Sequence, residues 1–193
     1  MTDRPDRLFR LLLADPPWHF GDDLPGPGRG AAKHYATMPI DAIMRYPIPF
    51  MERTSILLLW RVASMQQEAL DVARAWGFTI KSEIVWIKPR IGMGRYVRNR
   101  HETCLIGTRG KASRLITDRG IPSTFHAPVG RHSAKPDEFY ELVDRMMPEG
   151  EKAELFARRE RPGWHQWGRE LPGGEEAPGT IPSPTHLQID LFV

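Results

Sequence analysis

Leu11-Leu12-Leu13-Ala14-Asp15-Pro16-Pro17-Trp18 joins four consecutive apolar residues to an abrupt polar and proline-rich end. Such an apolar run is typical of a strand that is buried on both faces. The two prolines lack backbone donors and fix the backbone, so the strand ends there. In open α/β sheets, ligands bind at the carboxyl ends of the strands. Residues 15–18 are therefore predicted to lie at the mouth of a binding pocket.

The groups in this segment suit a flat base that carries an exocyclic amine. The amine of adenine is a weak nucleophile because its lone pair is delocalised into the ring, and two acceptors around its N–H bonds would draw it out of conjugation. Asp15 and the Pro16 carbonyl are the acceptors expected here. Pro17 and Trp18 would shape the slot for the base, and stacking on an aromatic ring is worth about 1–3 kcal/mol per base. The alternative is a proline-stiffened turn with Trp18 in the core.

Asp15-Pro16-Pro17-Trp18 resembles the signature of the MT-A70 family of adenine N(6)-methyltransferases, which includes the catalytic subunit of the messenger-RNA methylating complex and many bacterial and phage DNA methyltransferases. The resemblance implies an α/β fold of the Rossmann-like methyltransferase type. This fold has a mostly parallel sheet, helices on both faces, and a permuted order with the catalytic motif before the cofactor motif. It also implies S-adenosylmethionine as cofactor and a catalytic role for residues 15–18. Further segments resemble family landmarks in the family's order, at residues 35–38, 56–60, 76–78, 83–88, 102–105, 135–138 and 154–158.

The resemblance also implies which residues bind the cofactor. Lys135 stands at the start of a predicted helix, where the family holds the carboxylate of S-adenosylmethionine, and Phe156 and Arg158 lie at the tip of a predicted strand. The family usually has Gly-Asn followed by Gln or Glu where this chain has Gly168-Arg169-Glu170. A hydroxyl contact is therefore expected from Glu170, and the role of the middle residue stays open. The chain has no Gly-x-Gly-x-x-Gly loop, which argues against a nicotinamide or flavin dinucleotide.

A basic segment follows the predicted strand at 80–87. Residues 88–100 carry five Lys or Arg and no acidic residue, with glycines and one tyrosine between them. Such a segment is suited to a nucleic-acid backbone, and a solvated loop is the alternative. His34 and Tyr35 follow a Gly- and Pro-rich loop at 21–33 and could touch a base, and for each the alternative is a satisfied surface residue. The residues expected to bind substrate are His34, Tyr35, Lys88, Arg95, Tyr96, Arg98 and Arg100.

The length of 193 residues suits one α/β domain with short tails. Predicted strands lie at 11–14, 56–60, 80–87, 102–107 and 154–158, with helices after Ser64 and from residue 136. Residues 117–132 show no clear period and stay unassigned. The expected organisation is a methyltransferase domain at 1–171, a Pro/Gly-rich linker at 172–186 and a terminal peptide motif at 187–193.

Composition excludes several classes of protein. The single cysteine, Cys104, excludes an internal disulfide and a multi-cysteine zinc site, and the expected reaction needs no metal. The N-terminus lacks the apolar core of a signal peptide, and no stretch reaches the roughly 18 apolar residues of a membrane span. We therefore expect a cytoplasmic protein without a membrane segment. The net charge of +3 is by itself weak support for a nucleic-acid partner.

These observations together predict transfer of a methyl group from S-adenosylmethionine to the N(6) amine of adenine in DNA. Two alternatives stay open. The first is the same reaction on RNA, because the motif reads the base and not the sugar. The second is a non-catalytic nucleic-acid-binding subunit, which is known in the family. The intact Asp15 and Trp18 argue against this second alternative.

The last residues, Gln188-Ile189-Asp190-Leu191-Phe192-Val193, follow a stretch rich in Pro and Gly. Apolar residues on a disordered terminus lower solubility unless a partner covers them. The pattern resembles the short peptide by which bacterial replication and repair proteins dock on the sliding clamp. Gln188 would occupy a polar subsite of the clamp, and Leu191 and Phe192 would occupy an apolar pocket. The alternative is a tail that folds back onto the domain.

Overall fold

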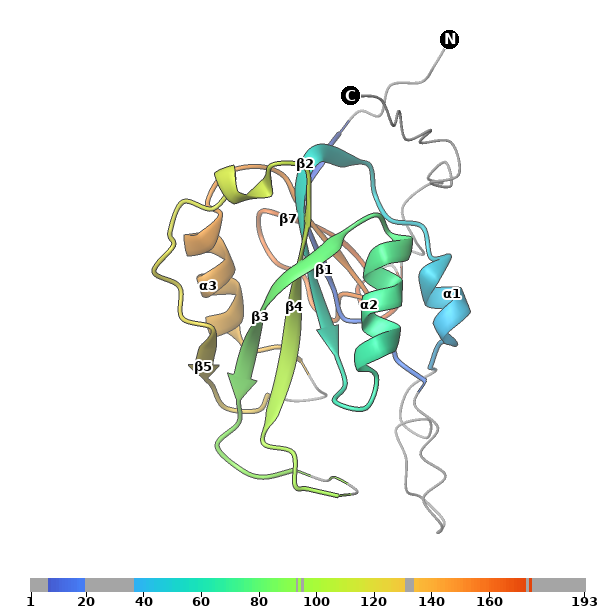
Figure 1. Ribbon diagram of the computed structural model, residues 1–193, viewed down its shortest axis with the longest axis vertical. Coiled ribbons are helices and arrows are strands. Elements are labelled where there is room, and N and C mark those ends of the chain that lie inside the picture. Colours follow the sequence, from blue (N-terminus) through green and yellow to red (C-terminus); the bar gives the residue numbers. More distant parts are fainter. Residues whose placement is uncertain are drawn as a thin grey trace.

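A computed structural model describes residues 7–19, 37–92, 94, 96–130, 134–172 and 174. The strands in these ranges form one seven-stranded sheet in the order β5-β3-β4-β2-β1-β6-β7 (Figure 1). Within the described ranges β4 alone runs antiparallel to its neighbours, and the other strand pairs are parallel. The strands are β1 (Phe9–Ala14), β2 (Met51–Arg61), β3 (Thr79–Ile87), β4 (His101–Arg109), β5 (Thr124–His126), β6 (Lys152–Leu155) and β7 (Trp164–Trp167).

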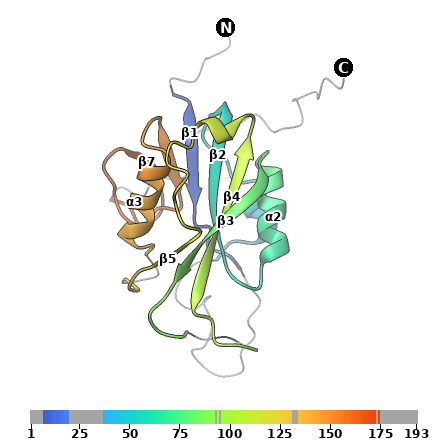
Figure 2. The same ribbon diagram turned by 60° about the vertical axis from the view of Figure 1, so that its left-hand side comes forward.

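Helices cover both faces of the sheet (Figure 1, Figure 2). The helices α1 (Ile40–Met44) and α2 (Gln66–Ala75) lie on one face, and α3 (Asp137–Met146) lies on the other. A short 3-10 turn, Ala112–Arg114, follows β4. The arrangement confirms the predicted α/β fold with a mostly parallel sheet and helices on both faces. Within the described ranges, no helix has the length and apolar character needed to cross a membrane.

The central strands separate two apolar cores, one beneath each helical layer. Leu12 and Ala14 of β1 belong to the core beneath α1 and α2, while Leu11 and Leu13 belong to the core beneath α3. All four residues are at most 1% exposed. Because both faces of β1 are covered, the strand needs a continuous apolar run rather than an alternating pattern. Cys104 is a free, buried cysteine in the core beneath α3.

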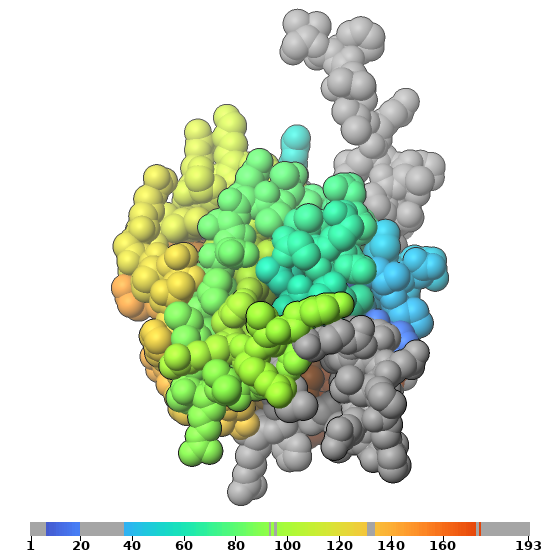
Figure 3. All heavy atoms as spheres, turned by 60° about the horizontal axis from the view of Figure 1, so that its bottom comes forward, coloured from blue at the N-terminus to red at the C-terminus, as the bar shows by residue number. Residues whose placement is uncertain are grey.

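The predicted site residues that the structure describes lie along one edge of the sheet, the one formed by the carboxyl ends of its parallel strands. The carboxyl ends of β1, β2, β3 and β6 meet there because these strands run in the same direction. β4 runs the opposite way, so its first residues reach the same edge. Residues 88–100 connect β3 to β4 as a hairpin loop, called here the 88–100 hairpin, which projects from this edge (Figure 1, Figure 3). The residues that follow β1, end β2 and begin β4 are therefore neighbours.

Three details differ from the elements expected from the sequence. The expected strand at 154–158 is β6, which ends at Leu155 because Phe156 leaves the strand with a φ of 62°. The unassigned residues 117–132 contain β5, and β7 is a further strand without a sequence signal. β5 and β7 are the outermost strands of the sheet and have three and four residues, respectively. Strands this short do not show a periodic pattern in the sequence.

Candidate active site

Asp15 directly follows β1 and stands on a tightly bonded turn. The N–H of Trp18 donates to the Pro16 carbonyl at 2.8 Å, and the N–H of Met38 donates to the Pro17 carbonyl at 2.7 Å. The Asp15 side chain is 19% exposed and is held at the carboxyl edge by this turn. The Pro16 carbonyl, which is predicted to accept from the substrate amine, already accepts one bond inside the turn. Its second lone pair is the one that could accept another donor.

Trp18 supports the turn from inside the core. Its side chain is 4% exposed and belongs to the core beneath α1 and α2. Its indole N–H donates to the Trp60 carbonyl at the end of β2, at 3.0 Å. Trp18 therefore fastens the tip of β1 to the tip of β2. Its ring therefore offers no exposed face on which a base could stack. Of the two positions considered from the sequence, the structure shows the one in the core.

Four charged side chains of alternating sign form a chain from Asp15 to the base of the 88–100 hairpin. The Nζ atom of Lys135 lies 2.5 Å from the carboxylate of Asp15 and 3.4 Å from that of Glu102. The Nζ atom of Lys88 lies 2.5 Å from the other carboxylate oxygen of Glu102. All four side chains are less than one third exposed, and that of Lys135 is only 8% exposed. Each partly buried charge thus has a partner of opposite sign.

The pKa values of the two central members move in the directions that keep both charged. Burial lowers the pKa of Lys135, but the charges of Asp15 and Glu102 outweigh burial and raise the pKa above its ordinary value. Burial raises the pKa of Glu102, but the charges of Lys135 and Lys88 and their hydrogen bonds outweigh it and lower the pKa. The Lys135 nitrogen also lies 5.0 Å from the centre of the Trp60 ring. At neutral pH these groups form a fixed pattern of charge.

Glu102 is a site residue to which the sequence analysis assigns no role. It is the second residue of β4, and it reaches the site only because β4 is antiparallel to β2 and β3. Lys88, which is predicted to bind phosphate, is instead held by Glu102 and lies 4.9 Å from the centre of the Trp86 ring. The structure therefore places Asp15, predicted to be catalytic, in direct contact with Lys135, predicted to bind the cofactor, and it places Lys88 in the same charged chain.

A small pocket opens between the tips of β1, β2 and β6 and the residues that precede α3. Its lining includes Asp15, Trp60, Lys135, Phe156 and Arg158. Phe156 is the one non-glycine residue with a positive φ among the residues that the structure describes. Such a backbone conformation is strained, and strain of this kind gathers at ligand-binding sites. The strained turn brings the chain out of β6 beside Asp15 and Lys135.

Arg158 and Glu170 meet beside this pocket. The Nη1 atom of Arg158 lies 3.7 Å from the carboxylate of Glu170. Their two segments can approach because Gly168 has no side chain, since a Cβ atom there would lie 2.0 Å from the carbonyl oxygen of Ala157. The N–H of Ala157 also donates to the Trp167 carbonyl at 3.0 Å. The predicted cofactor residues therefore share one corner of the site.

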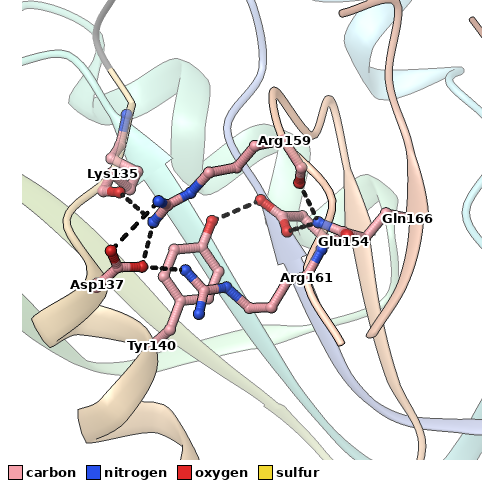
Figure 4. Close-up of polar contacts among 7 residues, drawn as sticks. All are labelled: Lys135, Asp137, Tyr140, Glu154, Arg159, Arg161 and Gln166. Atoms are coloured by element: carbon pink, nitrogen blue, oxygen red, sulfur yellow. Dashed lines mark hydrogen bonds and ion pairs between the residues drawn. The ribbon is translucent and has the colours of Figure 1, made fainter. Parts of the chain in front are cut away.

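A polar network built on the buried side chains of Glu154 and Tyr140 lies behind this corner (Figure 4). Glu154 of β6 accepts hydrogen bonds from the Tyr140 hydroxyl at 2.8 Å and from the Gln166 side-chain amide at 2.7 Å. Burial raises the pKa of Glu154, and these hydrogen bonds offset only part of that rise. Gln166 also donates to the Arg159 carbonyl at 2.9 Å and accepts from the N–H of Arg161 at 2.5 Å. The network joins α3, β6, β7 and the connection between the two strands.

Asp137, the first residue of α3, completes the network (Figure 4). Its carboxylate binds the guanidinium groups of both Arg161 and Arg159, and their hydrogen bonds lower the pKa of Asp137. The guanidinium of Arg161 lies 3.7 Å from the centre of the Tyr140 ring, and Arg159 donates to the Lys135 carbonyl at 3.5 Å. The residues before α3, which carry Lys135, are thereby fastened to the connection that leaves β6. No local sequence signal marks these ion pairs of Asp137 with Arg159 and Arg161.

The remaining predicted residues fall into two groups. Tyr96, Arg98 and Arg100 lie on the 88–100 hairpin, where Tyr96 is 93% exposed and the Nε atom of Arg100 donates to the Lys88 carbonyl at 3.0 Å. The hairpin therefore presents these residues at the same edge as Asp15. The other group lies outside the described residues and consists of His34, Tyr35, Arg95, Gln188, Leu191 and Phe192.

Comparison with known proteins agrees with this geometry. The family model described as MT-A70 matches residues 9–170. An N(6)-adenosine-methyltransferase MT-A70-like protein of Drosophila melanogaster is 30% identical over 176 residues, which cover 86% of this chain and 27% of that protein. The human N(6)-adenosine-methyltransferase catalytic subunit METTL3 is 30% identical over 176 residues, covering 86% of this chain and 28% of that protein.

The type II methyltransferase M.MunI of Mycoplasma sp is 26% identical over 204 residues, which cover 96% of this chain and 85% of that protein. The chain thus spans about a quarter of the length of the fly and human relatives but most of the length of M.MunI. The family match extends from β1, through the Asp15 turn and Lys135, to Glu170. By this match, the chain belongs to the MT-A70 family.

Proposed function

We propose that this protein transfers a methyl group from S-adenosylmethionine to the N(6) amine of adenine in DNA. The observation that carries the proposal is the pair formed by Asp15 and Lys135, 2.5 Å apart at a pocket that Phe156 and Arg158 also line. The names of the fly and human relatives support adenine N(6) chemistry. The match to a type II methyltransferase along most of both chains supports DNA as the substrate.

The groups at this corner fit S-adenosylmethionine, which carries a carboxylate, a ribose with two hydroxyls and an adenine ring. Lys135 and Arg158 supply cations for the carboxylate. Glu170 supplies an acceptor for a ribose hydroxyl, and Phe156 supplies an apolar ring for the adenine. When bound, the cofactor supplies an electrophilic methyl group. The task left to the protein is to hold the amine in line with that group.

The β1 turn performs this task in our proposal. The carboxylate of Asp15 accepts one N–H of the substrate amine, and the free lone pair of the Pro16 carbonyl accepts the other. Lys135 holds the Asp15 carboxylate in place, and Trp18 holds the turn against the tip of β2. Two acceptors around the amine draw its lone pair out of conjugation with the ring. Such positioning can supply about 7–11 kcal/mol of the barrier.

Nucleic-acid binding is assigned to the 88–100 hairpin. The segment carries no acidic residue, and Arg98 and Arg100 lie on the edge of the sheet that also carries Asp15. Cations that neutralise phosphates supply much of the affinity of a protein for nucleic acid. In the proposal these arginines hold the backbone on either side of the adenine that enters the site.

The proposal is tested with the full-length protein, labelled S-adenosylmethionine, and pools of random-sequence DNA and RNA. We expect label in DNA, recovered as N(6)-methyldeoxyadenosine after digestion to nucleosides. Label in RNA adenine alone would assign the same chemistry to RNA. Binding of DNA without transfer to either pool would instead indicate a non-catalytic binding subunit, and label in cytosine would contradict the assigned chemistry.

We further propose that residues 187–193 dock on the bacterial sliding clamp, with Gln188, Leu191 and Phe192 as the contacts. Tethering to the clamp would raise the local concentration of the enzyme on newly copied DNA. The test is a titration of purified clamp with the tail peptide and with the Leu191→Ala/Phe192→Ala peptide. Saturable binding that the double substitution removes supports docking, and equal or absent binding by both peptides contradicts it.

A further inference from the structure

The described residues of the 88–100 hairpin extend the pairing of β3 and β4. The N–H of Lys88 donates to the Arg100 carbonyl at 2.8 Å, and the N–H of Gly92 donates to the Asn99 carbonyl at 2.7 Å. The two arms therefore stay paired beyond the last residues of the sheet. Gly94 permits a tight turn near the end of the hairpin, because a Cβ atom there would lie 1.9 Å from the carbonyl oxygen of Val97. The hairpin crosses the near face in the view onto this edge (Figure 3).

The outer part of the hairpin carries apolar side chains in contact with water. Tyr96 is 93% exposed, Val97 is 71% exposed and Ile91 is 66% exposed. Among the large apolar side chains of the described residues, these three are the most exposed. Apolar groups gathered in this way mark a binding surface rather than a folding requirement, because the fold gains nothing from exposing them.

The charges around these side chains identify the partner. Arg90, Arg98 and Arg100 flank the apolar tip, and no acidic residue lies between residues 88 and 100. An apolar tip that is flanked along the chain by cations matches the two parts of a nucleic acid, stacked bases inside and phosphates outside.

The position of the hairpin relative to the site adds a second constraint. Its base is tied to Asp15 through Lys88, Glu102 and Lys135. Lys88 and Gly92 pair with the adjacent residues Arg100 and Asn99, so the first arm bends between them rather than running fully extended. The outer part of the hairpin stays on the side of the sheet that carries Asp15. The tip can therefore meet the duplex from which an adenine at Asp15 has been taken.

We propose that the substrate is duplex DNA and that the tip of the 88–100 hairpin, led by Tyr96, inserts between base pairs where the target adenine leaves the stack. The inference rests on the proposed function, because a paired adenine cannot reach Asp15 without leaving the duplex. Extrusion of a base costs a few kcal/mol. An aromatic ring that stacks in the gap offsets part of this cost, as apolar wedges do in other proteins that bend DNA.

The test measures methyl transfer to two substrates, a random-sequence duplex pool and one of its strands alone. The full-length wild type is compared with Tyr96→Ala and Tyr96→Phe. Because Tyr96 is 93% exposed, its truncation removes no core packing. Phe50→Ala is the matched control, since Phe50 is an exposed aromatic residue that precedes β2 at the opposite edge of the sheet.

We expect Tyr96→Ala to lower kcat/KM on the duplex about tenfold or more, and on the single strand less than about threefold, because the single strand needs no wedge. Tyr96→Phe and Phe50→Ala should both match the wild type on the duplex. The insertion of Tyr96 would be contradicted if Tyr96→Ala lost activity equally on both substrates or lost none on either. It would also be contradicted if the wild-type protein methylated only the single strand. Each of these results would leave the proposed function standing. Wild-type protein that methylates neither substrate would overturn both.

Discussion

The cofactor corner, residues 135–170, and the 88–100 hairpin lie at the same edge of the sheet, but different interactions hold them. In the cofactor corner, side chains bind one another: Glu154 accepts bonds from Tyr140 and Gln166. In the outer part of the hairpin, the Gly92 N–H donates to the Asn99 carbonyl across the two arms, and the Tyr96 side chain is 93% exposed. Lys88 and Glu102 form the boundary, because they belong to the hairpin base and also to the charged chain at Asp15.

In our proposal, the difference corresponds to two kinds of ligand, a cofactor at the corner and a nucleic acid at the hairpin. A small cofactor has one size and one set of polar groups, so a corner built in advance would bind it with little reorganisation. A nucleic acid presents phosphates and bases whose positions vary, and exposed side chains on a hairpin can adapt to them. We therefore expect substitutions in the corner to impair transfer to every substrate. Substitutions in the outer hairpin should alter the response to salt or strand state.

Lys135→Met should have the largest effect of the substitutions that test this comparison. It removes the cation that pairs with both Asp15 and Glu102, and we expect methyl transfer to fall about 100-fold or more on all substrates. Lys152→Met is the matched control, because Lys152 is 9% exposed and pairs with Asp144 at the opposite edge of the sheet. Both variants should lose stability in chemical denaturation. If the two lost activity equally, Lys135 would have only a structural role.

Arg98→Ala tests the outer hairpin, with Lys88→Ala as its counterpart at the base. We expect Arg98→Ala to weaken binding to all DNA sequences alike and to make the salt dependence of log K shallower by about 0.9 for the lost phosphate contact. Lys88→Ala should change this slope less, because Lys88 is held by Glu102. Binding at several salt concentrations measures both. Equal slopes for the two variants would mean that base and tip of the hairpin bind phosphate alike.

Asp137→Asn should have the smallest effect, and its effect should depend on pH. Hydrogen bonds from Arg161 and Arg159 lower the pKa of Asp137, so this stabilisation is present above the ordinary value of 3.8 and is lost as pH falls through the folded-state pKa. For a largely exposed ion pair we expect about 0.2–1 kcal/mol at neutral pH. Thermal unfolding from pH 7 towards pH 3, with Glu138→Gln as control, measures the difference. A difference independent of pH would contradict the assigned cause.

Local sequence signals were sufficient to predict those parts of the site that depend on a single strand or a single helix. The apolar run before Asp15 predicts a buried strand and its tip, and Lys135-Pro136-Asp137 predicts a helix start; the structure confirms both. These predictions hold because strand burial and helix initiation depend on neighbouring residues. Phe156 and Arg158 are predicted from the family resemblance rather than from a local pattern, and the structure places both just after β6.

The parts that depend on long-range placement could not be predicted in this way. Glu102 reaches the site because β4 is inserted antiparallel between β2 and β3, and no local pattern encodes that order. The ion pairs of Asp137 with Arg159 and Arg161 join residues that are more than 20 positions apart in the sequence. Trp18 packs in the core beneath α1 and α2, where its indole N–H finds the Trp60 carbonyl, and the pairing of β1 with β2 brings these two residues together.

The role of Asp15 in positioning the amine is tested most directly by Asp15→Asn, which keeps the shape of the side chain and removes its charge. The measurement pairs the single-turnover rate of methyl transfer to DNA with the equilibrium affinity for S-adenosylmethionine. We predict a rate lowered about 100-fold or more, with cofactor affinity within a few-fold of the wild type. A variant that transfers methyl at a rate within a few-fold of the wild type would contradict the assignment of Asp15.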